Sequence, residues 1–238
     1  MAKFLYVLFE KNSFLVSEGE WPMKKFEIYN YEDCDPSLTY VDVYDKKAKR
    51  TVKILTAKNL IESNYRNIPY ISVFHRVMNN FDVNCENFRR FLKKEYQVGF
   101  FKRNSIVAIP DDSINADKRH INDFFFSCGC INEVFMANTS LLISKNGEMD
   151  YCALTKSARA IALSLVLDSG LISQAFFPNE YSDLAHINTL LDSWRMQFKK
   201  MGLSVFLHGD NIELFSQLGS VVTNDVLLKN MKAISNGI

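Results

Sequence analysis

Residues 105–136 read SIVAIPDDSINADKRHINDFFFSCGCINEVFM, and this stretch decides how the chain is expected to fold. Ser105 to Pro110 is a short apolar run typical of a buried strand, and Ile131 to Met136 is a second one. The segment between them begins at Ser113 or a neighbour with N-capping residue types and ends at Gly129, which indicates a helix. A strand, a helix and a strand with short connections form a crossover unit. The sequence therefore predicts an α/β protein with mixed sheets and flanking helices.

Similar patterns extend on both sides of this unit. Upstream, they predict hairpins over residues 4–17 and 38–55, a strand over 25–31, and helices over 56–63 and 84–96. Downstream, they predict a hairpin over 149–167, strands over 203–208 and 221–222, and helices over 212–218 and 226–234. The most regular helix begins at Ser182 or Asp183, with apolar residues in steps of three and four up to Met201, and Gly202 ends it. We expect its apolar stripe to pack on a sheet.

The composition is that of a globular protein without a strong charge bias. Of 238 residues, 47% are hydrophobic, and 28 Lys and Arg balance 27 Asp and Glu, for a net charge of +1. Nucleic-acid modules are usually strongly basic, so nucleic acid is not an expected partner. No apolar run approaches the roughly 20 residues of a membrane-spanning helix. The five scattered cysteines predict buried free thiols and a reducing, cytoplasmic location.

Three more stretches, together with residues 105–136, carry a family resemblance. They are TYVDVYDKKAKRTVKILTAKNLIES at 39–63, SVFHRVMNNFDVNCENFRRFLKK at 72–94 and GLSVFLHGD at 202–210. In this order they resemble segments of the bacterial rod-shape actin MreB, within the actin-like ATPase superfamily. Each motif is short, so their collinear order carries the resemblance.

The resemblance implies an actin-like, ribonuclease H-like architecture of two lobes. Residues 1–145 would form the first lobe, with a small hairpin insertion around residues 25–75, and residues 146–238 would form the second lobe. Intact relatives have a whole subdomain between the last hairpin of the second lobe and the next helix. Here at most AFFPNEYSD, residues 175–183, fills that interval. The second lobe is therefore expected to lack the fourth subdomain, which closes over the nucleotide in the family.

The two phosphate loops of the family have counterparts that lack their glycines. Glycine matters there because only glycine lets backbone N–H groups approach phosphate without a Cβ in the way. VLFEKN at 7–12 matches the first loop, where Val7 replaces the metal-organising aspartate and Glu10 adds negative charge. CALTKSA at 152–158 matches the second loop and leaves Lys156 as a residue able to contact an anion, although an exposed turn lysine is the commoner case.

The remaining nucleotide motifs are also changed. The catalytic glutamate of the family maps to Asn138 or Thr139, and neither residue is a carboxylate base able to activate water. The adenosine glycines map to residues 208–211, where Gly209 alone remains. The resemblance with these losses implies no catalytic residues, no nucleotide cofactor, no metal and no ATPase activity.

Other residues that suggest chemistry have simpler interpretations. Asp111 and Asp112 are paired carboxylates, but helix-start residues favoured by the helix dipole explain them without catalysis. Cys128 and Cys130 lack further ligands at zinc-site spacing, so we expect core cysteines. The four histidines lie far apart and form no zinc-hydrolase or Cys-His motif.

One helix face is a candidate partner surface. Arg89, Arg90, Lys93 and Lys94 gather on one side of the helix over 84–96, opposite its apolar face. A solvated helix face is the alternative interpretation.

The expected function is that of a nucleotide-independent actin-like scaffold or adaptor that acts through protein–protein interaction. Its partner would be another copy or a membrane-associated assembly such as a pilus or secretion platform, which would place the protein in the cytoplasm or at the periphery of the inner membrane. The first alternative is an ATP-binding, MreB-like filament-forming cytoskeletal protein. The second is an unrelated α/β enzyme with a pocket near Lys156 and His208.

Overall fold

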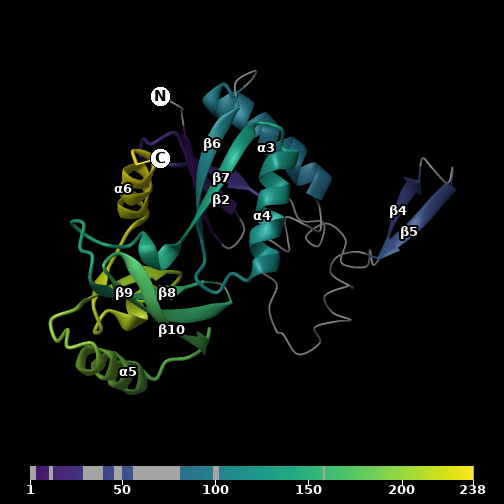
Figure 1. The fold of residues 1–238 in the computed structure, drawn as a ribbon. Helices are drawn as coiled ribbons and strands as arrows, with labels where there is room; N and C mark the ends of the chain where they lie inside the picture. The colour runs from purple at the N-terminus through teal and green to yellow at the C-terminus, as the bar shows by residue number, and fades with distance from the viewer. Residues whose placement is uncertain are drawn as a thin grey trace.

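The computed structural model describes residues 4–10, 13–28, 40–45, 50–55, 81–98, 102–157 and 159–237. Within these residues the chain forms two five-stranded sheets and one two-stranded hairpin (Figure 1). The hairpin consists of β4 (Tyr40–Asp45) and β5 (Arg50–Leu55), which pair antiparallel as the sequence predicts. The helix predicted over residues 56–63 lies outside the described residues.

The first sheet has the strand order β3-β2-β1-β6-β7. Its strands are β1 (Phe4–Phe9), β2 (Ser13–Ser17), β3 (Lys24–Glu27), β6 (Arg103–Ile109) and β7 (Ile131–Asn138). β1, β2 and β3 pair antiparallel, whereas β1, β6 and β7 run parallel. The helix α4 (Asn115–Ser127) joins β6 to β7, so the predicted crossover unit is confirmed. The helix α3 (Phe81–Tyr96) packs beside α4 on the same face.

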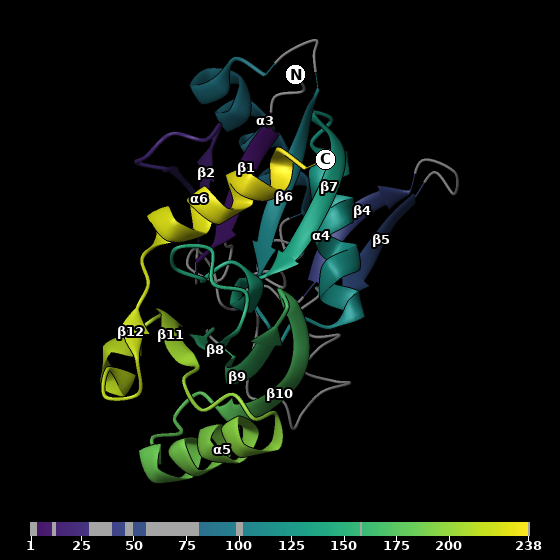
Figure 2. The same cartoon turned by 60° about the vertical axis from the view of Figure 1, so that its left-hand side comes forward.

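The second sheet has the order β10-β9-β8-β11-β12 and repeats the strand directions of the first. Its strands are β8 (Tyr151–Lys156), β9 (Ala160–Leu167), β10 (Gly170–Pro178), β11 (Ser204–Gly209) and β12 (Ser220–Val221). The helix α5 (Leu184–Gln197) covers the face turned away from the first sheet (Figure 2). The short 3-10 helices η2 (Thr139–Leu141) and η3 (Ile212–Phe215) follow β7 and β11. This topology confirms the expected α/β class with mixed sheets.

Three hydrophobic clusters fill the spaces between these layers. The first, between the first sheet and the helices α3 and α4, is rich in phenylalanine. The rings of Phe14 and Phe88 meet edge to face with centroids 5.7 Å apart, a favourable geometry for aromatic pairs. The second cluster lies between the two sheets. The third lies between the second sheet and α5, where Leu191 and Trp194 are buried.

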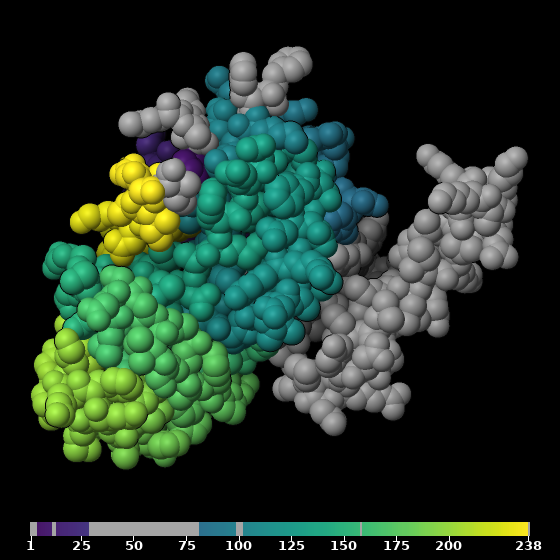
Figure 3. Space-filling view, viewed as in Figure 1, coloured from purple at the N-terminus to yellow at the C-terminus, as the bar shows by residue number. Residues whose placement is uncertain are grey.

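The last helix, α6 (Asn224–Ser235), follows the second sheet but packs against the first. Leu227, Leu228 and Met231 are buried with residues of β1 and β6 in the cluster between the sheets. The Tyr6 hydroxyl and Ser235 Oγ form a hydrogen bond of 2.7 Å. In Figure 3, the yellow residues of α6 lie beside the purple residues of the N-terminal strands. The chain therefore crosses from the first sheet to the second before β8 and returns to the first sheet before α6.

The boundaries of α5 differ in part from the prediction. The helix begins as expected after Asp183, whose Oδ1 accepts a hydrogen bond from the His186 N–H at 3.0 Å. It ends at Gln197, and Met201 lies beyond it with 70% of its surface exposed. The apolar stripe thus packs on the sheet only as far as Trp194 and the turn after it.

Only residues 179–183 separate β10 from α5. So short a connection leaves no room for a subdomain between these two elements. Cys85, Cys128, Cys130 and Cys152 are free and buried, in agreement with the prediction of core cysteines. None of the helices in the described ranges is long and apolar enough to cross a membrane.

Candidate functional site

A cavity of about 450 Å³ lies where the ends of the two sheets meet. Much of its lining lies at the C-terminal ends of the strands β1, β6, β8 and β11 or just after them. These residues are Phe9 and Glu10, Pro110 to Ser113, Thr155 to Ser157, and His208 to Asp210. β1 and β6 are parallel in the first sheet, and β8 and β11 are parallel in the second. Ligands of α/β proteins bind at the carboxyl ends of parallel strands, so this cavity is the candidate site.

The turn after β1 contributes a carboxylate to the cavity. Glu10 Oε2 accepts a hydrogen bond from Ser13 Oγ at 2.7 Å, and the Glu10 N–H donates to the Ser13 carbonyl at 2.9 Å. Lys25 Nζ lies 3.8 Å from the same carboxylate. These contacts hold the negative charge of Glu10 in the lining of the cavity.

In the turn after β8, three backbone N–H groups form hydrogen bonds with other groups of the same turn. Ser157 Oγ accepts hydrogen bonds from the N–H groups of Arg159 at 2.9 Å and Ala160 at 3.1 Å. The Ser157 N–H donates to the Ala160 carbonyl at 3.0 Å. A turn that binds phosphate needs several backbone N–H groups directed at the anion. Here three such groups already have partners within the turn.

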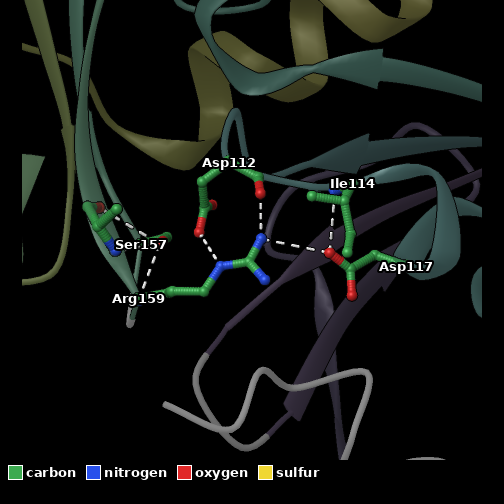
Figure 4. A network of polar contacts seen from close by, with 6 residues as sticks. Asp112, Ile114, Asp117, Ser157 and Arg159 are labelled. Carbon is green, nitrogen blue, oxygen red and sulfur yellow. Dashed lines mark hydrogen bonds and ion pairs between the residues drawn. The ribbon is translucent and has the colours of Figure 1, made fainter. Parts of the chain in front are cut away.

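Arg159 joins this turn to the loop after β6, as Figure 4 shows. Its Nε donates to Asp112 Oδ2, and its Nη2 donates to the Asp112 carbonyl and, at 3.2 Å, to Asp117 Oδ2. Asp117 Oδ2 also accepts the Ile114 N–H at 3.0 Å at the start of α4. The Arg159, Asp112 and Asp117 side chains are 25%, 9% and 11% exposed. We call these three residues the Arg159 clasp; they connect the second sheet to the first beside the cavity.

Asp111 forms a second, buried connection between the sheets. Its carboxylate accepts hydrogen bonds from Ser140 Oγ at 2.5 Å, from the Ser140 N–H at 3.1 Å and from Thr155 Oγ1 at 2.6 Å. Burial raises the pKa of Asp111, while these hydrogen bonds oppose that shift. Because Ser140 follows β7 and Thr155 belongs to β8, the carboxyl group holds the two sheets together.

At the end of β11 the backbone approaches that of β8 closely. Gly209 has a φ of +132°, and a Cβ there would lie 2.1 Å from the Lys156 carbonyl oxygen. His208 Nε2 lies 2.9 Å from Asn224 Oδ1, and burial lowers the pKa of His208. Packing between two strands therefore explains the glycine at this position without a ligand.

No protein-family model matches the sequence, and no curated protein matches it. Among solved structures, the AlfA filament bound to AMPPNP is similar over 98% of this chain and 99% of AlfA, with a TM-score of 0.52 and 10% identity. The chain has an actin-like fold.

Two other solved structures are similar at lower scores. EutJ, the ethanolamine utilization protein from Carboxydothermus hydrogenoformans, has a TM-score of 0.47 and 9% identity over 95% of this chain and 87% of EutJ. MreB5 of Spiroplasma citri bound to AMPPNP has a TM-score of 0.46 and 7% identity over 99% of this chain and 98% of MreB5.

In this actin-like fold the two turns matched to phosphate loops meet at one cavity. Glu10 and Lys156 both line it. No ion pair joins Lys156 to a carboxylate in the described part of the chain. Thr139, matched to the catalytic glutamate, also lines the cavity, and its Oγ1 donates to the Ile109 carbonyl at 2.9 Å.

The basic residues Arg89, Arg90, Lys93 and Lys94 lie on α3, which covers the outer face of the first sheet, and none of them lines the cavity. All four are exposed. Arg89 and Arg90 both form ion pairs with Glu86, and Lys94 forms one with Glu95. These pairs reduce the net positive charge of the face, and its use as a partner surface remains a proposal.

The contacts of four residues, Asp111, Asp112, Ser157 and Arg159, were not predicted from the sequence. The sequence does not mark Ser157 or Arg159, because a serine and an arginine two residues apart form no recognised binding motif. Asp111 and Asp112 were expected to act as helix-start residues, but α4 begins at Asn115 and both aspartates bind residues of the second sheet. Only the fold reveals these partners, since they lie more than forty positions away along the chain.

Proposed function

We propose that this chain is an actin-like scaffold that works through protein–protein contacts and does not depend on a bound nucleotide. The observation that carries the proposal is the state of the turn after β8. Its N–H groups at Ser157, Arg159 and Ala160 are bonded within the turn, and Arg159 is bonded to Asp112 and Asp117. A phosphate would have to break these contacts before it could bind there.

The charges of the cavity support the same proposal. Five carboxylic acids line it, namely Glu10, Asp111, Asp112, Asp210 and Glu213, against the cations Lys156 and Arg159. Arg159 is already balanced by carboxylates. A polyphosphate would therefore enter a cavity with an excess of negative charge, which disfavours binding.

The scaffold part of the proposal draws on the likeness to AlfA, whose solved structure is a filament. Nearly all of each chain is covered, so a chain of this size is compatible with assembly. We therefore extend to this chain the capacity to assemble with further copies. Docking to a membrane-associated platform through Arg89, Arg90, Lys93 and Lys94, in the cytoplasm, is the finer version of this proposal.

One observation favours the alternative function of an ATP-binding, filament-forming protein. The cavity of about 450 Å³ stands where the two matched loops meet, and it contains Lys156. The AlfA structure is described as bound to AMPPNP. Rearrangement of the Arg159 clasp would make room for a nucleotide in this alternative.

Thermal denaturation with and without Mg-ATP or Mg-ADP separates the two functions. A ligand at about 100 times its Kd stabilises the native state by about 2.7 kcal/mol, so binding would raise the Tm visibly. We expect no shift with either nucleotide, and light scattering that reports the same degree of assembly in their presence and absence. A shift that disappears in Lys156→Ala, but not in the control Lys145→Ala, whose lysine does not line the cavity, would establish nucleotide binding and refute the proposal.

A further inference from the structure

Each five-stranded sheet has two edge strands. The four edge strands differ in how well they are protected against pairing with another chain. Edge strands carry unpaired N–H and C=O groups that can pair with another chain, so proteins blunt them with charges, short length, bulges or proline. In the first sheet the edges are β3 and β7, and in the second they are β10 and β12.

Three of the four edges have clear protection. β3 is four residues long, and Lys24, Lys25 and Glu27 are charged and exposed. β12 has only two residues. β7 presents exposed Asn132 and Glu133, and Glu133 Oε2 accepts a hydrogen bond from Asn104 Nδ2 at 2.9 Å.

The fourth edge, β10, differs from the other three. It is nine residues long, its sequence GLISQAFFP contains no charged residue, and within the described residues it pairs only with β9. Figure 2 shows it as the outermost strand of its sheet. Ile172 and Phe176 are 50% and 51% exposed. Its protection consists of a bulge at Ile172, where a register shift separates Leu171 from Ser173, and of Pro178 as its last residue.

The sequence of β10 is suited to pairing with its own copy. The midpoint of Gly170–Pro178 is Gln174, and Ile172 and Phe176 lie equally far on either side of it. A two-fold axis at Gln174 would therefore pair two antiparallel copies of the strand, and the bulge would set Leu171 and Ile172 of each copy opposite Phe176 of the other. Pairs of aromatic and β-branched residues stabilise adjacent strands.

The geometry points to β10 as a homodimer interface, in which the β10 edges of two copies join their second sheets into one continuous sheet. A second copy fits better than an unrelated strand because the exposed apolar residues match themselves about the axis. The absence of charge also avoids the like-charge repulsion that any charged strand near its own image would suffer. This inference deepens the proposed scaffold function by naming one surface and its partner.

Site-directed cross-linking tests the register of this interface. In the proposed pair the two Gln174 residues are directly opposite, with Cβ atoms about 4.5–5.5 Å apart, a distance close to that of a disulfide. We expect Gln174→Cys to form disulfide-linked dimers under mild oxidation, in a background where Cys34, the fifth cysteine, which lies outside the described residues, is replaced by serine. The matched control Ile172→Cys should not, since its two copies would be about 13 Å apart along the strands. Equal cross-linking of both variants, or none in either, would overturn the proposed register.

Sedimentation velocity tests the interface without new cysteines. We expect the wild type to dimerise as its concentration rises, and Ile172→Lys/Phe176→Lys to raise the dimer Kd by about tenfold or more. The control Met196→Lys/Met201→Lys changes two exposed residues near α5 and should dimerise like the wild type. Circular dichroism verifies that both variants are folded. A monomeric wild type, or a dimer that both variants leave intact, would exclude the interface; neither result depends on nucleotide, so the thermal-shift test of the proposed function stands apart.

Discussion

The first sheet runs β3-β2-β1-β6-β7 and the second β10-β9-β8-β11-β12, and the strand directions follow the same order in both. Their surroundings differ. Two helices and a cluster of phenylalanines cover the outer face of the first sheet, whereas α5 covers that of the second. The first sheet ends in a short charged strand and the second in a long uncharged one.

The turns after the equivalent strands β1 and β8 differ as well. The first contains Glu10, and the second contains Ser157 and Arg159, which bind within the turn or across to the first sheet. The repeated topology explains why a cavity lies where the two sheets meet. The side chains of the turns, which the topology does not determine, control what the cavity can hold.

The largest expected effect is in the aromatic cluster of the first sheet. Phe88 is fully buried among other rings, so Phe88→Ala should lower the free energy of unfolding by about 3–5 kcal/mol. Leu191→Ala, beneath the second sheet, should cost about 2–5 kcal/mol. Urea denaturation followed by circular dichroism measures both. If the two sheets unfold as one unit, each variant moves a single transition; a second transition in either variant would show that they unfold separately.

The next largest effect is expected at Gly209, and it tests whether packing against β8, and not a ligand, requires glycine at the end of β11. Gly209→Ala would place a Cβ 2.1 Å from the Lys156 carbonyl oxygen at a φ of +132°, so we expect a loss of about 2–3 kcal/mol. The control Gly129→Ala, with a φ of +71° and no atom within 4 Å of the new Cβ, should cost about 1 kcal/mol. Thermal melts without ligand measure the difference. Equal losses would contradict the close approach of β11 to β8.

A smaller effect is expected from the Arg159 clasp. Arg159→Gln leaves Asp112 and Asp117 largely buried without their cation, and should lower stability by about 1–3 kcal/mol. Arg90→Gln breaks an ion pair whose arginine is 73% exposed, so its cost should stay below about 0.5 kcal/mol. Chemical denaturation of the two variants compares them directly. A clasp variant as stable as Arg90→Gln would mean that the ion pairs across the cavity add little to the contact between the sheets.

The stability of the protein should depend on pH through Asp111. Burial raises the pKa of Asp111 above its ordinary value of 3.8, so the folded state holds the proton more tightly than the unfolded state. The stability gained from the protonated carboxyl is fully present below 3.8 and is lost as pH rises through the folded pKa. The free energy of unfolding of the wild type minus that of Asp111→Asn should therefore fall as the pH rises from 3.8 through the folded pKa, and should be constant above it. Urea denaturation at several pH values measures this difference, and a difference that rises with pH would reverse the sign of the shift.

The sequence predicted the strands and helices well because their apolar spacing is a local property. The crossover of β6, α4 and β7 and the start of α5 at Asp183 follow from that spacing and from capping residues. The early end of α5 was not predicted, since Phe198 and Met201 continue the apolar spacing beyond the helix.

Of the candidate site, the sequence indicated only a pocket near Lys156 and His208, and only as part of an alternative function. Both residues line the cavity, and Glu10 lines it too. The partners of Arg159 and Asp111 depend on how the two sheets face each other, which no local pattern in the sequence records.

The return of α6 to the first sheet has a consequence for the synthesis of the protein. The strands β1 and β6 leave the ribosome early, but the helix that buries Leu8 and Ile106 is made only after the whole second sheet. At about 5–20 residues per second, roughly 6 to 25 seconds pass between the end of β6 and the end of α6. During that time the nascent chain exposes an apolar surface, and a chaperone that binds such surfaces would protect it from aggregation.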